Sequence, residues 1–170
     1  MKTFSQFLTE DISQDTYMKG RCAIFALALH LEKGYPLGIM WDSNEDGRRD
    51  YMMLGDVDYD AYDEWETKHG EPFEPEDFAV PMHVYCYKTP TILVDVMGQT
   101  TESKMIQFFR KHSAAINDQF EPSFTESDRD EVEDLMKPAS PGNPHGGMLA
   151  PKPGEIEKLK QYIRTNPDRY

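Results

Sequence analysis

One stretch, residues 20–31, constrains the fold of this chain more than any other. Its sequence, GRCAIFALALHL, is apolar on nearly every side. A helix that is apolar all round is buried inside a domain. The pattern therefore predicts a buried helix over about residues 20–33, capped by Gly34 and stopped by Pro36. The one reactive side chain in it, Cys22, lies at the N-terminal end.

Cys22 stands where a helix favours a thiolate. The positive end of the helix dipole and the free N–H groups of the first turn lower the pKa of a thiol. Gly20 permits a sharp turn just before it, and Arg21 adds a positive charge. The alternative interpretation is a small buried hydrophobic residue, the commonest role of a free cysteine. The choice depends on whether a histidine and an acid converge on the thiol.

Length and charge limit the class of partner. A chain of 170 residues is long enough for one domain with its own core. The formal net charge is -13, and no concentrated basic face is visible, so we expect neither nucleic acid nor an acidic membrane surface as a partner. No run reaches the length of a membrane span, and the N-terminus lacks a signal-peptide pattern. We therefore expect a cytoplasmic protein whose two cysteines, Cys22 and Cys86, are free thiols.

Residues 82–98 predict an antiparallel hairpin, since two β-rich runs flank a polar turn that contains proline. The alternation of side chains puts His83 and Asp95 on one face and turns Cys86, a packing residue, to the other. The predicted register, around a five-residue loop, pairs His83 with Asp95, Tyr85 with Leu93 and Cys86 with Ile92.

Cys22, His83 and Asp95 are the residue types of a cysteine-nucleophile triad. The thiolate attacks an acyl carbon, the imidazole passes a proton to the leaving group, and the carboxylate fixes the imidazole tautomer. Such a set acts on amides, esters or thioesters and needs no cofactor. The backbone N–H of Cys22 is one expected oxyanion donor, and Gln14 and Tyr17 are the candidates for a second donor or a substrate contact.

An acidic insertion over about residues 42–80 separates a short apolar strand, residues 37–41, from His83. Tyr59, Tyr62 and Trp65 recur at intervals of three, which predicts one face of a helix ended by Gly70.

The insertion opens with a spacing that matches the start of a calcium loop. The acidic and amide residues at this spacing are Asp42, Asn44, Asp46 and Asp50. Met53 stands where the bidentate glutamate is needed, and no flanking helix pair is apparent. We therefore expect an acidic hairpin turn with no metal, and a calcium site stays open as the alternative.

The chain divides into three parts. Residues 1–136 are expected to form one α+β domain, with helices at about 1–10, 101–112 and 128–136. Residues 137–154, rich in proline and glycine, are expected to be a linker. Residues 155–170 contain a last amphipathic helix, which packs either on its own domain or on a partner.

Four motifs follow one another along the chain: G-x-C-x-x-F-A-x-A-L, P-L-G-I-M-W-D, H-V-Y-C-Y and V-D-V-M-G-Q-T-T. The first, third and fourth contain Cys22, His83 and Asp95. Over about residues 17–110 they resemble papain-like cysteine hydrolases, the superfamily of bacterial cell-wall amidase/peptidases and transglutaminase-like proteins. The resemblance implies a central helix on an antiparallel sheet, with Cys22 as nucleophile, His83 as base and Asp95 as the orienting acid. It also implies a protein or peptide substrate cleaved at an amide.

The opening MKTFSQFLTED resembles the starts of small proteins of tailed bacteriophages, which implies the host cytoplasm or the virion as location. The alternative function is a catalytically inactive member of the same fold. Such a protein would bind a host protein as an inhibitor, or serve as a virion component.

Overall fold

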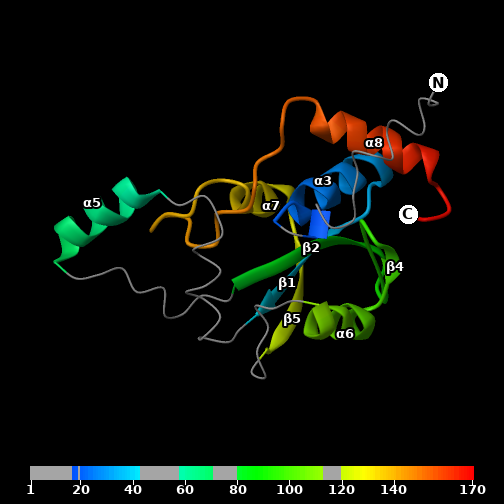
Figure 1. The fold of residues 1–170 in the computed structure, drawn as a ribbon, viewed down its shortest axis with the longest axis horizontal. Helices are drawn as coiled ribbons and strands as arrows, with labels where there is room; N and C mark the ends of the chain where they lie inside the picture. The colour runs from blue at the N-terminus through cyan, green and yellow to red at the C-terminus, as the bar shows by residue number, and fades with distance from the viewer. Residues whose placement is uncertain (1–16, 19, 43–57, 71–79, 113–119) are drawn as a thin grey trace.

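The computed structural model describes residues 17–18, 20–42, 58–70, 80–112 and 120–170. Within these ranges the chain forms five helices and one five-stranded antiparallel sheet (Figure 1), which confirms the expected α+β class. The elements in chain order are α3 (Cys22–Lys33), β1 (Leu37–Asp42), α5 (Tyr59–His69), β2 (Val80–Thr89), β3 (Ile92–Asp95), β4 (Gly98–Thr100), α6 (Glu102–His112), β5 (Pro122–Ser127), α7 (Arg129–Leu135) and α8 (Glu155–Thr165).

The strands lie in the order β4-β3-β2-β1-β5. β1 pairs with β2 on one side and with β5 on the other, so the predicted strand at residues 37–41 is one of the inner strands of the sheet. β4 and β5, the two edge strands, were not predicted from the sequence. β4 is only three residues long, and β5 alternates between half-buried and exposed positions without a strong apolar pattern.

Helix α3 is the buried helix that the sequence predicts. Gly20 has φ +74°, a left-handed conformation that lets the chain turn so that Cys22 becomes the first helical residue. Gly34 (φ +70°) ends the helix, and its N–H donates to the carbonyl of His30 at 2.8 Å. The eight residues Cys22–Leu29 are all buried.

The sheet carries helices on both faces (Figure 1). On one face, α3 packs against β2, and α7 and α8 pack against α3. These helices share a hydrophobic core with strand side chains such as Ile39, Val84 and Val94. On the other face, α6 contributes Met105 and Phe109 to a second core. Successive residues of β1, β2 and β3 alternate between these two cores, as the strand period requires.

The predicted register of the hairpin is wrong by two residues. Cys86 pairs with Val94, and the strands are joined by the two residues between Thr89 and Ile92 instead of by a five-residue loop. A shift of two leaves every side chain on its predicted face. Cys86 accordingly lies in the core beside α3, and its sulfur donates to the carbonyl of Ala26 at 3.3 Å.

The segment from residue 137 to 154 follows the surface of the domain closely. The N–H of Met148 donates to the carbonyl of Leu135 at 2.8 Å, and that of Leu149 donates to the carbonyl of Gly20 at 3.1 Å. Helix α8 then packs on α3 through Leu159 and Ile163, which are fully buried. The last helix therefore packs on its own chain.

Helix α5 confirms the predicted helix in the acidic insertion. The carboxylate of Asp58 accepts a hydrogen bond from the N–H of Ala61 at its start, and Gly70 ends it in a left-handed conformation. No residue of the helix is buried, and it stands away from the sheet (Figure 1).

The expected helix at residues 1–10 lies outside the described residues. So does most of the calcium-loop motif, namely Asn44, Asp46, Asp50 and Met53. Asp42 is described: it ends β1, is buried, and its Oδ1 accepts the backbone N–H of Glu121 at 3.1 Å. Among the described residues, no group of three or more histidine, cysteine or acidic side chains is arranged to hold a metal. In the same ranges, no helix has both the length and the apolar character needed to cross a membrane.

Candidate active site

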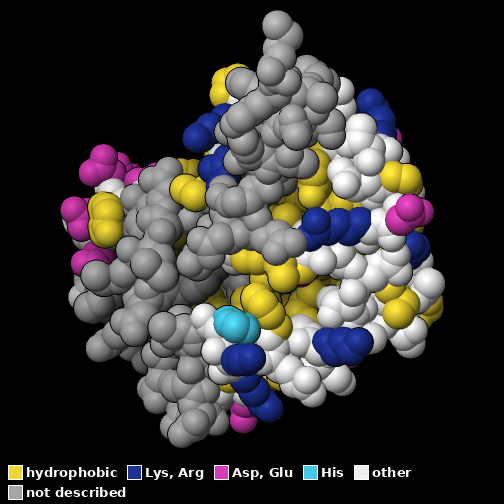
Figure 2. Space-filling model, turned by 45° about the vertical axis from the view of Figure 1, so that its right-hand side comes forward, with side chains coloured by type: hydrophobic (Ala, Val, Ile, Leu, Met, Phe, Trp, Pro, Cys, Tyr) yellow, Lys and Arg dark blue, Asp and Glu magenta, His cyan; other side chains and the backbone are white. Residues whose placement is uncertain are grey.

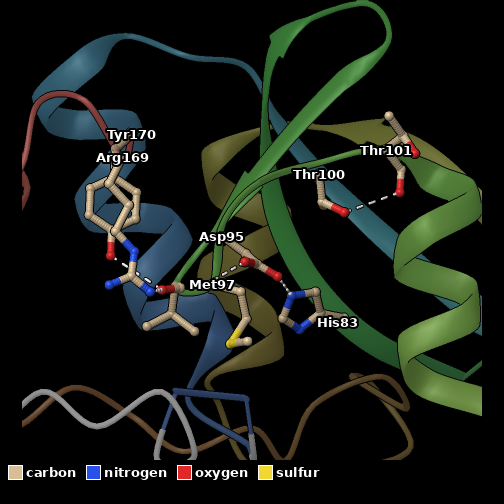
Figure 3. A network of polar contacts seen from close by, with 8 residues as sticks. His83, Asp95, Met97, Thr100, Thr101, Arg169 and Tyr170 are labelled. Atoms are coloured by element: carbon tan, nitrogen blue, oxygen red, sulfur yellow. Dashed lines mark hydrogen bonds and ion pairs between the residues drawn. The ribbon is translucent and has the colours of Figure 1, made fainter. Parts of the chain in front are cut away.

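His83 and Asp95 form a buried pair. His83 lies on β2 and Asp95 is the last residue of β3. Nε2 of His83 and Oδ2 of Asp95 are 3.0 Å apart, and the two side chains are 0% and 6% exposed (Figure 3). Oδ1 of the same carboxylate accepts the backbone N–H of Met97 at 2.7 Å. With one oxygen on the ring and one on the backbone, the carboxylate has a fixed orientation.

The other ring nitrogen of His83, Nδ1, is buried and has no hydrogen-bond partner of normal geometry among the described residues. A buried nitrogen without a partner costs free energy, so its surroundings need an explanation. The ring packs against Phe109 of α6, with 5.2 Å between centroids. The thiol of Cys22 interacts electrostatically with the ring, and each group shifts the pKa of the other. In enzymes without ligand, a catalytic contact of this kind is often long and tightens on binding.

The sulfur of Cys22 is buried, with 3% of the residue exposed. Burial alone raises the pKa of the Cys22 thiol. The interaction with His83 and the backbone hydrogen bonds from Val84 and Ala23 outweigh burial, so the pKa falls below its ordinary value. The contribution of Ala23 is that of a helix N-terminus, as the sequence predicts.

The pKa of the His83 imidazole shifts in the opposite direction to that of the Cys22 thiol. Burial lowers the pKa of its imidazole, but Asp95 and the Cys22 sulfur together raise this pKa from 6.5 to about 10. These opposite directions favour a thiolate and an imidazolium over a neutral thiol and a neutral imidazole. The charged pair is the reactive form of a cysteine nucleophile.

The end of β3 explains how the three groups meet. Cys86 with Val94 is the last register pair before β3 ends at Asp95, while β2 continues on to His83 and beyond. His83 is thus displaced from the position opposite Asp95, and its side chain reaches the carboxylate diagonally. Val84 lies past the end of β3, and its backbone is among the groups that lower the pKa of the Cys22 thiol at the first turn of α3.

Tyr17 and Arg21 are held by a residue that sequence analysis did not single out. The carboxylate of Glu155, at the start of α8, accepts the hydroxyl of Tyr17 at 2.8 Å and pairs with the guanidinium of Arg21. The hydroxyl of Tyr17 is therefore already engaged, and the charge of Arg21 is neutralised. Gln14, the other predicted oxyanion candidate, lies outside the described residues.

Two further residues near the site, Arg169 and Tyr170, also escaped sequence analysis. They follow α8 and donate hydrogen bonds to the carbonyl of Val96, next to Asp95 (Figure 3). No sequence pattern could have found these residues or Glu155, because their contacts join positions more than 70 residues apart.

Comparisons with known proteins found no relative of this chain: no protein-family model, curated protein or solved structure matches it.

Proposed function

We propose that this protein is a cysteine-dependent hydrolase or acyl-transferase that acts on an amide or peptide substrate, with a papain-like arrangement of Cys22, His83 and Asp95. The observation that carries the proposal is the buried His83–Asp95 pair, at 3.0 Å, whose ring is coupled to the thiol at the start of α3. The opposite pKa shifts of thiol and imidazole are those that nucleophilic catalysis requires.

The reaction follows from the protonation states. The thiolate of Cys22 attacks the acyl carbon, and the developing oxyanion is stabilised by the backbone N–H of Cys22. The imidazolium of His83 gives its proton to the leaving amine as the carbon–nitrogen bond breaks, and an acyl-enzyme remains. Neutral His83 then takes a proton from water, or from a second amine, as that nucleophile attacks the acyl carbon. The carbon–sulfur bond breaks, the acyl group leaves as an acid or a new amide, and the thiolate and imidazolium are restored. Asp95 holds the ring in one orientation throughout.

Burial of the site favours a second candidate function. Cys22 is 3% exposed and His83 is 0% exposed, and the backbone of Leu149 is bonded to Gly20 beside the nucleophile. A substrate must therefore displace part of the surrounding chain. If it does not, the same fold serves as an inactive binding or inhibitor module, or as a virion component.

Acylation by p-nitrophenyl acetate tests the proposal without knowledge of the natural substrate. We expect a burst of p-nitrophenolate and an acetyl group on Cys22 in the intact-mass spectrum. Cys22→Ala should lower the burst rate by about 10³-fold or more. The matched control is Cys86→Ala, because burial raises the pKa of the Cys86 thiol and its sulfur is bonded within the core.

The outcome that contradicts an enzyme is equal and slow acylation of both cysteines in the folded protein. That result supports the binding module, because a buried thiol that is no more reactive than a packing cysteine has no catalytic function.

A further inference from the structure

The segment that follows α8 returns to the candidate active site. A guanidinium N–H of Arg169 (Nη2) donates to the carbonyl oxygen of Val96 at 2.8 Å, and the hydroxyl of Tyr170 donates to the same oxygen at 3.2 Å (Figure 3). Val96 immediately follows Asp95, the acid of the triad. Two donors from one distant segment thus converge on the backbone next to the catalytic carboxylate.

Val96 belongs to a tight turn whose geometry aims the carboxylate. Asp95 pairs with Gly98 across the β3–β4 ladder, so Val96 and Met97 are the two residues of the turn. The N–H of Met97 donates to Oδ1 of Asp95 at 2.7 Å, which leaves Oδ2 for His83. Any rotation of the turn therefore moves the carboxylate relative to the imidazole.

Arg169 also packs against this turn. Gly98 has φ +100°, and a Cβ atom at that position would lie 3.3 Å from Cγ of Arg169. The second guanidinium nitrogen, Nη1, donates to the hydroxyl of Tyr162 on α8 at 3.3 Å. Arg169 thus connects the turn directly to α8.

Tyr170 connects the same turn to α3. Tyr170 is 1% exposed. The centroid of its ring lies 5.4 Å from that of Phe25 and 5.9 Å from that of Tyr162. Phe25 is three residues after Cys22, about one helical turn further along α3. The side chain of Tyr170 therefore links α3, which its ring contacts, to the β3–β4 turn, which its hydroxyl contacts.

We infer that Arg169 and Tyr170 are positioning residues that hold the β3–β4 turn against α3 and so keep Asp95 in line with His83 and Cys22. This inference rests on the proposed function. Neither residue touches the reacting atoms. They act through the carbonyl of Val96 and the orientation of the Asp95 carboxylate.

The groups that surround the triad allow a clean pH test. His83 interacts with Asp95 and Cys22, and α6 places the ring of Phe109 against it. Asp95 has Tyr170 as a further titratable neighbour, and burial raises the pKa of Tyr170 above its ordinary value, so its hydroxyl stays protonated at neutral pH. The guanidinium of Arg169 stays charged throughout.

The measurement is the ultraviolet absorbance of the Cys22 thiolate as a function of pH, taken as the difference between the protein and its Cys22→Ser variant. Absorbance needs no reagent to enter the buried site. Arg169→Met keeps the aliphatic packing but removes the hydrogen bond to Val96. We expect thiolate formation to move upward by about one pH unit, because a misplaced Asp95 supports the imidazolium less well.

Arg164→Met is the matched control. Arg164 lies in the last turn of α8, five residues before Arg169; its side chain is 56% exposed and pairs with Glu32. Its loss should leave the thiolate curve unchanged. Tyr170→Phe keeps the buried ring and removes only the hydroxyl, so it provides the same test if Arg169→Met does not fold, with a smaller upward shift expected.

A double-mutant cycle separates positioning from general stability. Asp95→Asn should raise the pH of thiolate formation by about 1–3 units. Added to Asp95→Asn, Arg169→Met should cause no further shift, because both changes act on the same carboxylate.

Two failures are distinguishable. If the unmutated protein forms no thiolate below the ordinary range of a thiol, the proposed function fails and the inference fails with it. If that protein does form the thiolate early, but Arg169→Met and Tyr170→Phe titrate like Arg164→Met, the proposed function stands and the positioning role is overturned. Equal shifts with and without Asp95 also overturn it.

Discussion

At the scale of residues, the site depends on a balance between burial and charge. Burial raises the pKa of Cys22 and lowers that of His83, so by itself it keeps both groups neutral. Asp95 and the Cys22 sulfur together reverse this effect on the pKa of the imidazole, and His83 with the backbone of Val84 and Ala23 reverses it for the thiol. The sequence supplies the residue types, and their placement in the fold determines these shifts.

The rate of acylation should depend on pH through the protonation of both Cys22 and His83. In the proposed mechanism, the reactive species carries a thiolate on Cys22 and a proton on His83, so the rate of acylation should follow a bell-shaped curve against pH. Its acid limb should lie below 9.0, the ordinary thiol value, since the pKa of Cys22 is lowered. Its alkaline limb should lie near pH 10, where His83 loses its proton. The measurement is the p-nitrophenolate burst rate against pH, corrected with Cys22→Ala.

Asp95→Asn tests the cause of the alkaline limb. Without the carboxylate the pKa of His83 should fall from about 10 toward 6.5 and thiolate formation should move to higher pH, so the bell should narrow from both sides, and its alkaline limb reports on His83. Circular dichroism at each pH controls for unfolding. An alkaline limb that does not move in Asp95→Asn would show that another group controls it.

At the scale of elements, the first turn of α3 is joined to the first turn of α8. Glu155 accepts hydrogen bonds from Tyr17, from Arg21 and from the backbone N–H of Lys152. The side chains of Arg21 and Glu155 are only 12% and 11% exposed, so the pair is largely desolvated. Removing one member of such a pair leaves a poorly solvated charge without its partner.

Glu155→Gln should therefore reduce the free energy of unfolding at neutral pH by about 3 kcal/mol, measured by urea denaturation. Burial raises the pKa of Glu155, but the bonds from Arg21, Lys152 and Tyr17 outweigh it and lower the folded-state pKa below 4.5. The contribution is present above that value and is lost as the pH falls through the folded-state pKa. The difference between the two proteins should accordingly shrink in acid.

Glu157→Gln is the control for this prediction. Glu157 lies two residues further along α8, its side chain is 70% exposed, and it pairs with Lys160 at the surface. Its loss should cost less than about 1 kcal/mol. Equal losses for the two variants would mean that the α3–α8 junction contributes nothing beyond an ordinary surface pair.

At the scale of the whole molecule, the surface charge is uneven, whereas the core on the α3 side of the sheet is continuous. On the face in Figure 2, hydrophobic side chains lie at the centre with lysine and arginine around them, and most of the coloured acidic side chains lie toward one edge. The net charge of -13 therefore does not describe every face equally. The core on the α3 side is continuous: it includes Leu159 and Ile163 of α8 as well as Val132 and Leu135 of α7.

Leu159→Ala should consequently destabilise the whole domain. Leu159 is fully buried against the core of α3, and its truncation should cost about 2–5 kcal/mol. Unfolding should remain one transition, with the same midpoint by far-ultraviolet circular dichroism and by the fluorescence of Trp41 in a Trp65→Phe background. Lys158→Ala, at an exposed neighbouring position, should change stability by less than about 0.5 kcal/mol. An earlier, separate loss of helix signal in Leu159→Ala would show α8 to be an appendage.

The sequence by itself determined the parts that depend on local chemistry. The apolar run before Gly34 specified α3 and placed Cys22 at its first turn, because an all-apolar helix must be buried and a left-handed glycine ends it. Strand alternation gave the correct faces for the hairpin, since a register error of two preserves them.

The tertiary structure decided what depends on distant partners. It set the actual register of the hairpin and added the edge strands β4 and β5 to the sheet. It also brought Glu155, Arg169 and Tyr170 to the site from the far end of the chain. No local pattern encodes such contacts, because their free energy arises only when the segments are already packed together.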